Sequence, residues 1–449
     1  MRIAVVGMGV MGLTTGAGFA DLGHSVECVD LDNRRIADLA RGIINSREPG
    51  LESLLLRNRS AGRLSFNHDP AKLHEDTELI MIAMDTPVDE SGEMLLSGIW
   101  TVIDQLTPGN QNIKRIIALK SSVPVGTSDR IETRLRGRMP QDQMPDVVYI
   151  PDFMREGYAL RDFYEPSRIV IGAASQEAAE RLSLLYARLP GPILKTDRRS
   201  AELAKLAANA FLAVKISFAN EMAALAEQTG ADYPTVAQSL SLDPRIGPYS
   251  LGAGIGFGGS FLPKDARALV LMADEAGAPQ TLLEASVRAN AMLPLRMVRR
   301  LEAAISDPSR RKVAILGLAY KPGTNDLREA PALRVISELL RRHPGIVLTA
   351  YDPEISVMKN PAIPATVSLC ASAEEALTGA DAAIVATEWR EFKQISPEHF
   401  KKWMNRPIIM DGRNTLDSVA LNAQGVVCIG VGHVPASPQG NGQRHKLPN

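Results

Sequence analysis

The sequence predicts an α/β fold in which two doubly wound domains are joined by one long central helix. Three observations support this prediction. Short β-branched runs alternate with helical patterns from residue 1 to about residue 195. Between Ser200 and Gly230 the chain has neither proline nor glycine, and its apolar residues recur at helical spacing, which predicts a single helix of about thirty residues. The alternation of strands and helices then resumes at Arg311.

The first domain opens with a strand–helix–strand unit. Met1 to Val6 is a β-branched run that ends in glycines, an amphipathic stretch reaches Leu22, and a second strand follows from Ser25 to Val29. Further apolar runs occur at 79–84, 115–119, 147–150 and 169–171. Because helical patterns separate these runs, we expect a parallel sheet with helices on both faces, in a domain that covers residues 1–195.

The remainder is expected to be a helical connector followed by a second α/β domain. The connector, residues 196–305, holds the long helix and a second helical segment from Gln280 to Ala304. The last domain, residues 306–434, begins with a strand at 311–316, a turn at Gly317 and a helix at 331–342. Its further strands are expected at 347–351, 382–386, 407–410 and 426–429. Residues 435–449, rich in Pro, Gly, Gln and Asn, are predicted to be disordered.

Composition excludes several classes of function. Fifty basic and fifty-one acidic residues give a net charge of -1, so no overall field attracts nucleic acid or an anionic membrane surface. No stretch of the sequence is both long and apolar enough to span a bilayer. The three cysteines, Cys28, Cys370 and Cys428, are sparse and odd in number, which favours a reducing compartment such as the cytoplasm.

A glycine-rich loop follows the first strand. Gly7-Met8-Gly9-Val10-Met11-Gly12 is a G-x-G-x-x-G motif between a strand and a helix, and Asp30 ends the next strand. In a Rossmann-like unit the first glycine permits the tight turn, the second leaves room for a pyrophosphate, and the third lets helix and strand pack closely. Asp30 would accept the ribose hydroxyls and repel a 2'-phosphate, which favours NAD over NADP, although Arg35 lies nearby.

Two further patterns contain side chains suited to catalysis or to ligand binding. Lys205 and Asn209 are four residues apart on the long helix, so they share one face and can take a hydroxyl proton and orient its oxygen. An exposed lysine paired with Glu202 is the alternative interpretation. The glycine-dense loop 252–260, followed by Lys264 and Asp265, indicates close backbone approach to a bulky anionic ligand with a cation beside it.

These motifs, with others, resemble the UDP-glucose/GDP-mannose dehydrogenase family along nearly the whole chain. The matching segments besides the cofactor loop are Glu48-Pro49-Gly50-Leu51, Thr86-Pro87, Lys120 to Thr127, Pro151 to Gly157, Lys205 with Asn209, Arg245-Ile246-Gly247, the glycine loop, Gly317 to Glu329, Tyr351-Asp352-Pro353 and Asp411 to Asn414. The resemblance implies an NAD-dependent dehydrogenase that acts on a nucleotide-diphosphate sugar or a related nucleoside phosphate. It also implies that the first domain binds NAD, the last binds the sugar nucleotide, and the long helix forms much of a homodimer interface.

The resemblance assigns roles to individual residues. It implies that catalysis depends on Lys205, Asn209, Asp265, Asp152 and Ser122. It implies cofactor contacts from Gly7, Gly9, Val10, Met11, Gly12, Asp30, Arg35 and Thr86. It implies substrate contacts from Phe153, Arg155, Glu156, Arg245, Tyr249, Gly256, Phe257, Gly258, Phe261, Lys264, Lys321 and Arg413. No metal ion is expected.

The chain departs from the family pattern at positions that matter for the second oxidation. The family motif reads Gly-Gly-Ser-Cys-Phe-Pro-Lys-Asp, and its cysteine attacks the aldehyde of the first oxidation, whereas Phe261 stands at that position here. A phenyl ring has no lone pair to attack a carbonyl, so covalent catalysis at this position is excluded. The glutamate that assists thioester hydrolysis in the family is here Asp152, which is shorter by one methylene. Ser122 replaces the usual threonine and keeps the hydroxyl.

The leading hypothesis is therefore a two-electron oxidation of a CH–OH group to an aldehyde or ketone. One alternative is the four-electron conversion to a uronate, in which the aldehyde is oxidised as its hydrate without a thioester. Another is a catalytically silent protein that binds the nucleotides and regulates a partner, against which the retained Lys205 and Asn209 argue. Phe261 can also be interpreted as an inactivating change, which the parallel change at Asp152 disfavours.

Overall fold

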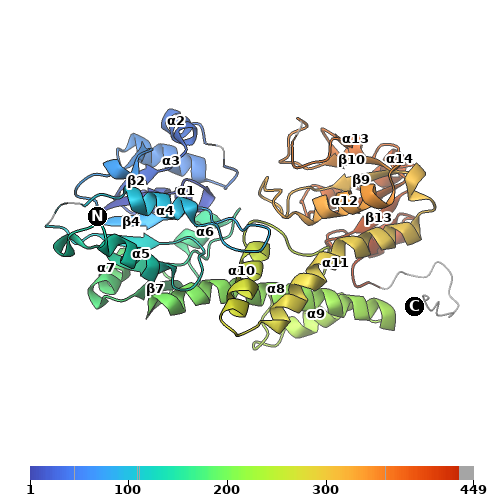
Figure 1. Cartoon of the computed structure of the whole chain (residues 1–449). Helices are drawn as coiled ribbons and strands as arrows, with labels where there is room; N and C mark the ends of the chain where they lie inside the picture. The colour runs from blue at the N-terminus through green and yellow to red at the C-terminus, as the bar shows by residue number, and fades with distance from the viewer. Residues whose placement is uncertain (45, 109, 111, 359, 434–449) are drawn as a thin grey trace. The chain divides into compact units, whose positions relative to one another are not determined.

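The chain forms two compact units in the computed structural model, which describes residues 1–44, 46–108, 110, 112–358 and 360–433 (Figure 1). Unit 1 comprises Met1–Leu212, Ser260–Glu284 and Gly323–Asn325. Unit 2 comprises Ala213–Gly259, Ala285–Pro322 and Asp326–Asn449. The tail 435–449, which the sequence predicts to be disordered, lies outside the described residues. Each unit contains one twisted sheet and its own hydrophobic core.

Unit 1 is built on an eight-stranded sheet with the order β3-β2-β1-β4-β5-β6-β7-β8. Its strands are β1 (Arg2–Val6), β2 (Ser25–Val29), β3 (Leu64–Asn67), β4 (Leu79–Ile82), β5 (Ile116–Leu119), β6 (Asp146–Tyr149), β7 (Ile169–Ala173) and β8 (Ile193–Thr196). Its helices up to residue 186 are α1 (Val10–Asp21), α2 (Asn33–Arg41), α3 (Leu51–Ser60), α4 (Ser97–Gln105), α5 (Thr127–Arg136), α6 (Ala159–Tyr164) and α7 (Gln176–Tyr186). The central strands β4 and β5 are fully buried along their length, which explains why they read as continuous apolar runs.

The expected parallel pairing is confirmed for the first six strands of this sheet and is wrong at β7. Strands β6 and β7 pair antiparallel, while β7 and β8 pair in parallel. An antiparallel neighbour begins at the edge of the sheet where the preceding strand ends, so it needs no crossover. The connection 150–168 therefore stays at the carboxyl edge of β6, and it is this connection that carries Asp152 and Phe153.

Unit 2 repeats the strand order of the first six strands of unit 1. Its sheet has the order β11-β10-β9-β12-β13-β14, and every pairing in it is parallel. The strands are β9 (Lys312–Leu316), β10 (Val347–Tyr351), β11 (Val367–Leu369), β12 (Ala382–Val385), β13 (Ile408–Asp411) and β14 (Val427–Gly430). The helices between them are α12 (Pro331–Arg342), α13 (Ala373–Leu377), α14 (Pro397–Trp403) and α15 (Ser418–Ala423). The expectation of two doubly wound sheets is confirmed.

The predicted long helix is also present. Helix α8 spans Arg198–Thr229, within two residues of the expected start and one of the expected end. It belongs to unit 1 as far as Leu212 and to unit 2 from Ala213. The other helices of this part of the chain are α9 (Tyr233–Ser241), α10 (Leu262–Glu275) and α11 (Thr281–Ala304). Of the helices that the structure describes, none combines the length and the apolar character that crossing a membrane requires.

The sequence does not predict three short strands, and all three lie at sheet edges. β3, β8 and β11 each pair with one neighbour only in the described sheets. An edge strand has few buried positions, and β8 carries its exposed side chains in the middle of the strand. Because such strands lack a continuous apolar run or a clear alternation, sequence periodicity gives no signal for them.

Candidate active site

The glycine loop of unit 1 has the geometry that its spacing predicts. Gly7 has φ +98°, and a Cβ there would lie 2.8 Å from the carbonyl oxygen of Ala83, so only glycine fits. A Cβ at Gly12 would lie 1.7 Å from the carbonyl oxygen of Gly7, so α1 and the turn are in closest contact there. A Cβ at Gly9 would meet no atom within 4 Å. No side chain caps the amino end of α1 at Gly9. The first backbone amides of the helix are therefore free of a side-chain cap and can bind a pyrophosphate.

Asp30 is fixed at the end of β2. Its carboxylate accepts hydrogen bonds from the backbone N–H groups of Met8 (2.7 Å) and Asp32 (2.9 Å). Arg35 forms an ion pair with it at 3.0 Å, and the Arg35 side chain is 49% exposed. The carboxylate therefore holds the loop through Met8, and its contact with a ribose remains a prediction. These residues fit NAD.

Unit 1 also gathers a buried polar cluster around Asp265, the fourth residue of α10. Asp265 is fully buried, and its Oδ2 accepts hydrogen bonds from Asn209 Nδ2 (2.6 Å) and Ser122 Oγ (3.3 Å). Its Oδ1 accepts one from Lys264 Nζ at 2.7 Å. Four residues predicted as site residues thus meet in one network, although Ser122 and Asp265 are 143 positions apart in the chain.

Lys205 lies in the same cluster, and its pKa fits a general base. Its Nζ donates a hydrogen bond to the backbone oxygen of Asp152 and lies 5.6 Å from the centre of the Phe261 ring. Burial lowers the pKa of Lys205, and the nearby Lys264 and Lys120 lower it further, while Asp152 and Asp265 act in the opposite direction. A lysine must be neutral to accept a proton, so each influence that disfavours its charged form prepares it for that role.

The charges around Lys205 show which of three buried lysines is suited to be the base. Lys264 is paired with Asp265 at 2.7 Å, and Lys120 is paired with Asp152 at 3.5 Å. Lys205 is hydrogen bonded to a neutral backbone oxygen instead. Burial lowers the pKa of Lys205, and its hydrogen bond to a neutral carbonyl oxygen leaves it suited to be the base.

In unit 2 the glycine loop packs closely against its own chain. A Cβ at Gly258 would lie 2.3 Å from the carbonyl oxygen of Glu329, and one at Gly254 would lie 2.6 Å from that of Gly412. Backbone packing within unit 2 therefore requires the glycines at 254 and 258, whereas a Cβ at Gly252 would meet no atom within 4 Å. Arg413 crosses the loop, where its Nη1 donates to the backbone oxygen of Gly256 at 2.9 Å.

Comparison with family models identifies this arrangement. The models of the UDP-glucose/GDP-mannose dehydrogenase family match the chain in order: the NAD binding domain over residues 1–190, the central domain over 199–292 and the UDP binding domain over 314–418. The chain belongs to the UDP-glucose/GDP-mannose dehydrogenase family. It is an NAD-dependent dehydrogenase that acts on CH–OH groups, and the expectation of an NAD cofactor is confirmed.

Relatives match over almost the whole chain. UDP-glucose 6-dehydrogenase of Pseudomonas aeruginosa is 40% identical over 446 residues, which cover 96% of this chain and 97% of that protein. A UDP-glucose 6-dehydrogenase of Bacillus subtilis is 37% identical and covers 98% of this chain and 99% of its own length. The solved UDP-glucose dehydrogenase of Pyrobaculum islandicum aligns with a TM-score of 0.88 at 33% identity, covering 96% of this chain and 98% of its own.

The structure rejects the surface interpretation of Lys205. The Lys205 side chain is 5% exposed, and Glu202, its supposed partner, is fully buried. Glu202 is hydrogen bonded to Gly126 and Ser128 at the start of α5. In this dehydrogenase Lys205 is thus an interior side chain, and Glu202, three residues before it on α8, contacts the start of α5.

Lys264 and Thr86, predicted to contact substrate and cofactor, make internal contacts. Lys264 Nζ donates to Thr86 Oγ1 at 3.2 Å in addition to its pair with Asp265. Thr86 Oγ1 donates in turn to the backbone oxygen of Ser122 at 2.7 Å. Both side chains are buried, and together they join α10 to the backbone of Ser122. Their contacts with ligands remain predictions.

The other predicted substrate residues lie nearer the surface and have local partners. Arg155 is paired with Asp162, Glu156 accepts a hydrogen bond from Thr324, and Arg245 is paired with Asp243. In unit 2, the backbone N–H of Phe257 is held by Asn290, Lys321 lies over the Tyr320 ring at 5.5 Å, and Tyr249 is 79% exposed. Their roles towards a sugar nucleotide remain predictions.

Two residues of the cluster were not among the predicted site residues. Lys120 immediately follows the buried strand β5, and the carboxyl ends of parallel strands are where polar site residues gather, so its position could have revealed it. Glu202 could be found only from the fold, because its partners lie more than 70 positions away in the chain.

The cysteines lie outside this cluster. Cys28 belongs to β2, Cys370 follows β11 and Cys428 belongs to β14, and all are free and buried. Burial raises the pKa of both Cys28 and Cys428 to about 12. A thiol with so high a pKa is a poor nucleophile at neutral pH. No group of three metal-ligating side chains occurs among the described residues.

Proposed function

We propose that this dehydrogenase carries out one two-electron oxidation of a CH–OH group on a nucleotide sugar and releases the carbonyl product. The observation that carries the proposal is the aromatic ring of Phe261, centred 5.6 Å from Lys205 Nζ. The resemblance implies that the family's cysteine stands at this position. The second oxidation of the family begins with attack by a thiolate on the aldehyde, and a phenyl ring cannot attack. The chain's own cysteines are buried outside the Asp265 cluster, so the aldehyde is left without a thiol nucleophile.

The residues of the Asp265 cluster have complementary tasks in the single oxidation. NAD, when bound, accepts the hydride from the carbinol carbon. Neutral Lys205 accepts the hydroxyl proton, so the C–H and O–H bonds break while the carbonyl forms. The amide of Asn209, held by Asp265, orients the substrate oxygen, and Ser122 fixes the same carboxylate from the other side.

Asp152 is badly placed to complete a second oxidation. Its Oδ1 lies 3.5 Å from Lys120 Nζ and accepts the backbone N–H of Met154 at 3.1 Å. The carboxylate is thus already engaged by a buried cation and a backbone N–H, and it is one methylene shorter than the glutamate of the family pattern. The side chain therefore shapes the loop beside Lys205 and does not activate water.

The relatives suggest the class of substrate. The Pseudomonas aeruginosa relative is named UDP-glucose 6-dehydrogenase, and a solved structure from Pyrococcus horikoshii, with TM-score 0.83 and 29% identity, is described as a UDP-D-ManNAc dehydrogenase. A UDP-sugar oxidised at a primary alcohol is the substrate we propose, with a 6-aldehyde as product. The four-electron conversion to a uronate is the competing outcome.

The exposed face of α8 supports the predicted homodimer. Phe211, Phe218 and Leu225 recur every seven residues on this helix and are 65%, 46% and 53% exposed. Large apolar side chains at heptad spacing on an exposed helix favour pairing with another helix, and we propose a second copy of the chain as the partner. Sedimentation at micromolar concentration tests this: twice the 48.5 kDa mass of the chain is expected, and a monomer contradicts it. The buried free cysteines accord with a reducing, cytoplasmic location.

Replacing Phe261 by cysteine tests the proposed function. The variant regains a nucleophile, but Asp152 remains tied to Lys120, so we expect a thioester that forms and hydrolyses slowly. With UDP-glucose and NAD, the intact mass of the protein should increase by one acyl group while little uronate is released. Phe261→Ala, which opens the same space without a thiol, is the control and should show no adduct.

Two outcomes would count against the proposal. Rapid uronate release by Phe261→Cys would mean that Asp152 still activates water. Uronate release by the wild type, with UDP-, GDP- and dTDP-sugars each tried as substrate, would mean that no thiol is needed.

A further inference from the structure

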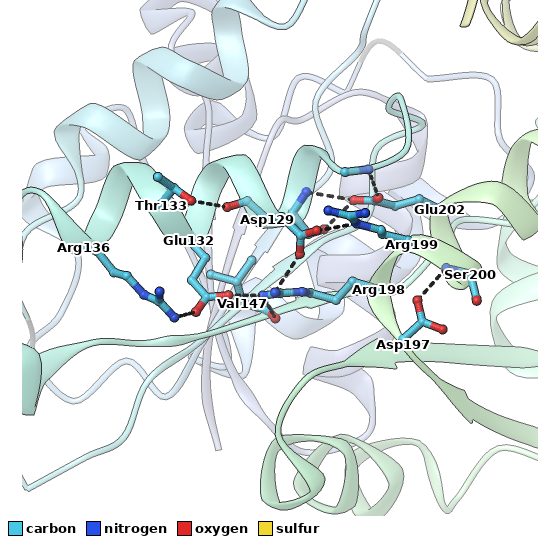
Figure 2. Close-up of polar contacts among 12 residues, drawn as sticks. Asp129, Glu132, Thr133, Arg136, Val147, Asp197, Arg198, Arg199, Ser200 and Glu202 are labelled. Atoms are coloured by element: carbon cyan, nitrogen blue, oxygen red, sulfur yellow. Dashed lines mark hydrogen bonds and ion pairs between the residues drawn. The ribbon is translucent and has the colours of Figure 1, made fainter. Parts of the chain in front are cut away.

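We infer that Glu202 is a positioning residue for the hydride-transfer step: it fixes Lys205 relative to the loop that carries Ser122. The inference rests on the proposed role of Lys205 as the base. It is carried by the hydrogen bonds that join α8 to the start of α5 (Figure 2).

Glu202 makes three hydrogen bonds from a fully buried position. Its Oε2 accepts the backbone N–H of Gly126 at 2.6 Å, and its Oε1 accepts both the N–H (2.8 Å) and the Oγ (2.7 Å) of Ser128. These groups begin α5, where backbone amides have no partner within the helix and favour a negative charge. Three donors and the end of a helix thus compensate a carboxylate that has been removed from water.

The same contacts connect the two halves of the catalytic cluster. Lys205 follows Glu202 by three residues on α8 and Asn209 follows it by seven, so about one and two turns separate them. Ser122 and Lys120 lie in the loop that leads from β5 to Gly126. Besides Glu202, two residues join α8 to this loop near the cluster: Asp265, which both Ser122 and Asn209 contact, and Asp152, which contacts Lys205 and Lys120.

A salt bridge near Glu202, between Arg199 and Asp129, is much more exposed than Glu202 itself. Arg199 is paired with Asp129 of α5 at 2.7 Å, a contact that Figure 2 shows beside Glu202, but the Arg199 side chain is 69% exposed. An exposed ion pair contributes little to stability, and its loss leaves no buried group unsatisfied. Arg199→Ala is therefore a matched control, since it removes a link between the same two helices without touching the amides of Gly126 and Ser128.

The decisive variant is Glu202→Gln. The glutamine oxygen can accept the hydrogen bonds from Ser128, but the NH2 group then faces the backbone N–H of Gly126. One hydrogen bond between α8 and the loop is therefore lost. We expect kcat for NADH formation to fall about 10- to 100-fold, as for a base displaced by about 1 Å, with the KM of NAD unchanged. UDP-glucose is the first substrate tried, followed by the other nucleotide sugars. Ser128→Ala, which removes one of the three hydrogen bonds, should have a smaller effect in the same direction.

The pH profile separates positioning from a direct charge effect. The groups that face Lys205 are Asp152, Asp265, Lys264 and Lys120. If Lys205 moves out of its buried position, its pKa rises towards the ordinary value, and the acid limb of kcat shifts to higher pH. Simple removal of a negative charge nearby would lower the pKa of Lys205 and shift that limb to lower pH. We expect the upward shift in Glu202→Gln and no shift in Arg199→Ala.

A second measurement does not depend on catalysis. Lys205 should react slowly with acetic anhydride in the wild type because it is buried, and faster in Glu202→Gln, as followed by peptide mass spectrometry. Unchanged labelling, kcat and acid limb in Glu202→Gln, or a fall in thermal stability alone, would overturn the inference. A wild type that forms no NADH with any nucleotide sugar refutes the proposed function, and the labelling then still decides the role of Glu202.

Discussion

Replacing Lys205 by methionine is expected to lower kcat for NADH formation by about a thousandfold, since general base catalysis contributes roughly 10²- to 10⁴-fold. Methionine keeps the length and apolar stem of the side chain, so α8 should fold normally, but it cannot accept the hydroxyl proton. Steady-state rates at saturating NAD and UDP-glucose measure the effect, and the binding of NAD alone should not change.

A second lysine of the same helix provides the control. Lys215, also on α8, donates to the backbone oxygen of Ile246 at 3.0 Å, and Lys215→Met should keep wild-type kcat. The kcat of the wild type should rise with pH as Lys205 loses its proton, with a midpoint below 10.5 because burial lowers the pKa of this lysine. If Lys205→Met retained more than a tenth of the wild-type rate, another group would be the base.

Asp265→Asn is expected to impair both stability and catalysis. The change leaves Lys264 buried without its carboxylate, and breaking one side of a buried ion pair costs about 3–5 kcal/mol. The asparagine also presents an NH2 group where Asn209 and Ser122 now donate, so the substrate-orienting amide loses its anchor. Denaturant unfolding and kcat at saturating substrate measure the two effects.

Two further variants test the origin of the effect. Asp274→Asn, an exposed position on the same helix α10, should change neither quantity. In the double variant Asp265→Asn with Lys264→Met the unpaired charge is removed, so much of the lost stability should return while catalysis stays low. A double variant as unstable as Asp265→Asn alone would mean that the ion pair is not the source of the stability loss.

Much of the architecture follows from local patterns. The turn at Gly7, the contact of Gly12 with that turn and the length of α8 are set by residues close in sequence, so spacing alone predicts them. Lys205 and Asn209 share a helix face for the same reason. The strands that were missed lie at sheet edges, where exposure removes the apolar signal.

The parts of the site that sequence could not predict depend on contacts between distant segments. Lys264 looked like a cation beside a ligand, but its nearest carboxylate is the adjacent Asp265, and only the fold shows that both are buried. Glu202 looked like a surface partner for Lys205 until the fold placed the start of α5 beside it. Two glycines of loop 252–260, Gly258 and Gly254, are required by the backbone at residues 329 and 412, which no local pattern reveals.

The contacts of Phe261 and Asp152 help to interpret the two departures from the family pattern. Asn209, Asp265 and Ser122, proposed for the first oxidation, form one buried, hydrogen-bonded network, and Lys205 is buried with them. Phe261 contributes only a ring beside Lys205, and the carboxylate of Asp152 is paired with Lys120. An enzyme damaged at random would be expected to lose groups from both steps. We therefore interpret the pair of changes as a dehydrogenase adapted to stop after one hydride transfer.

The most direct test measures the number of NADH molecules formed for each molecule of product. Wild-type protein is incubated with a limiting amount of the nucleotide sugar that it oxidises and excess NAD; NADH is read by absorbance, and the nucleotide-sugar product is identified by mass after trapping with hydroxylamine. One NADH for each molecule of carbonyl product, trapped as its oxime, is the predicted result. Two NADH for each molecule of uronate would contradict the account.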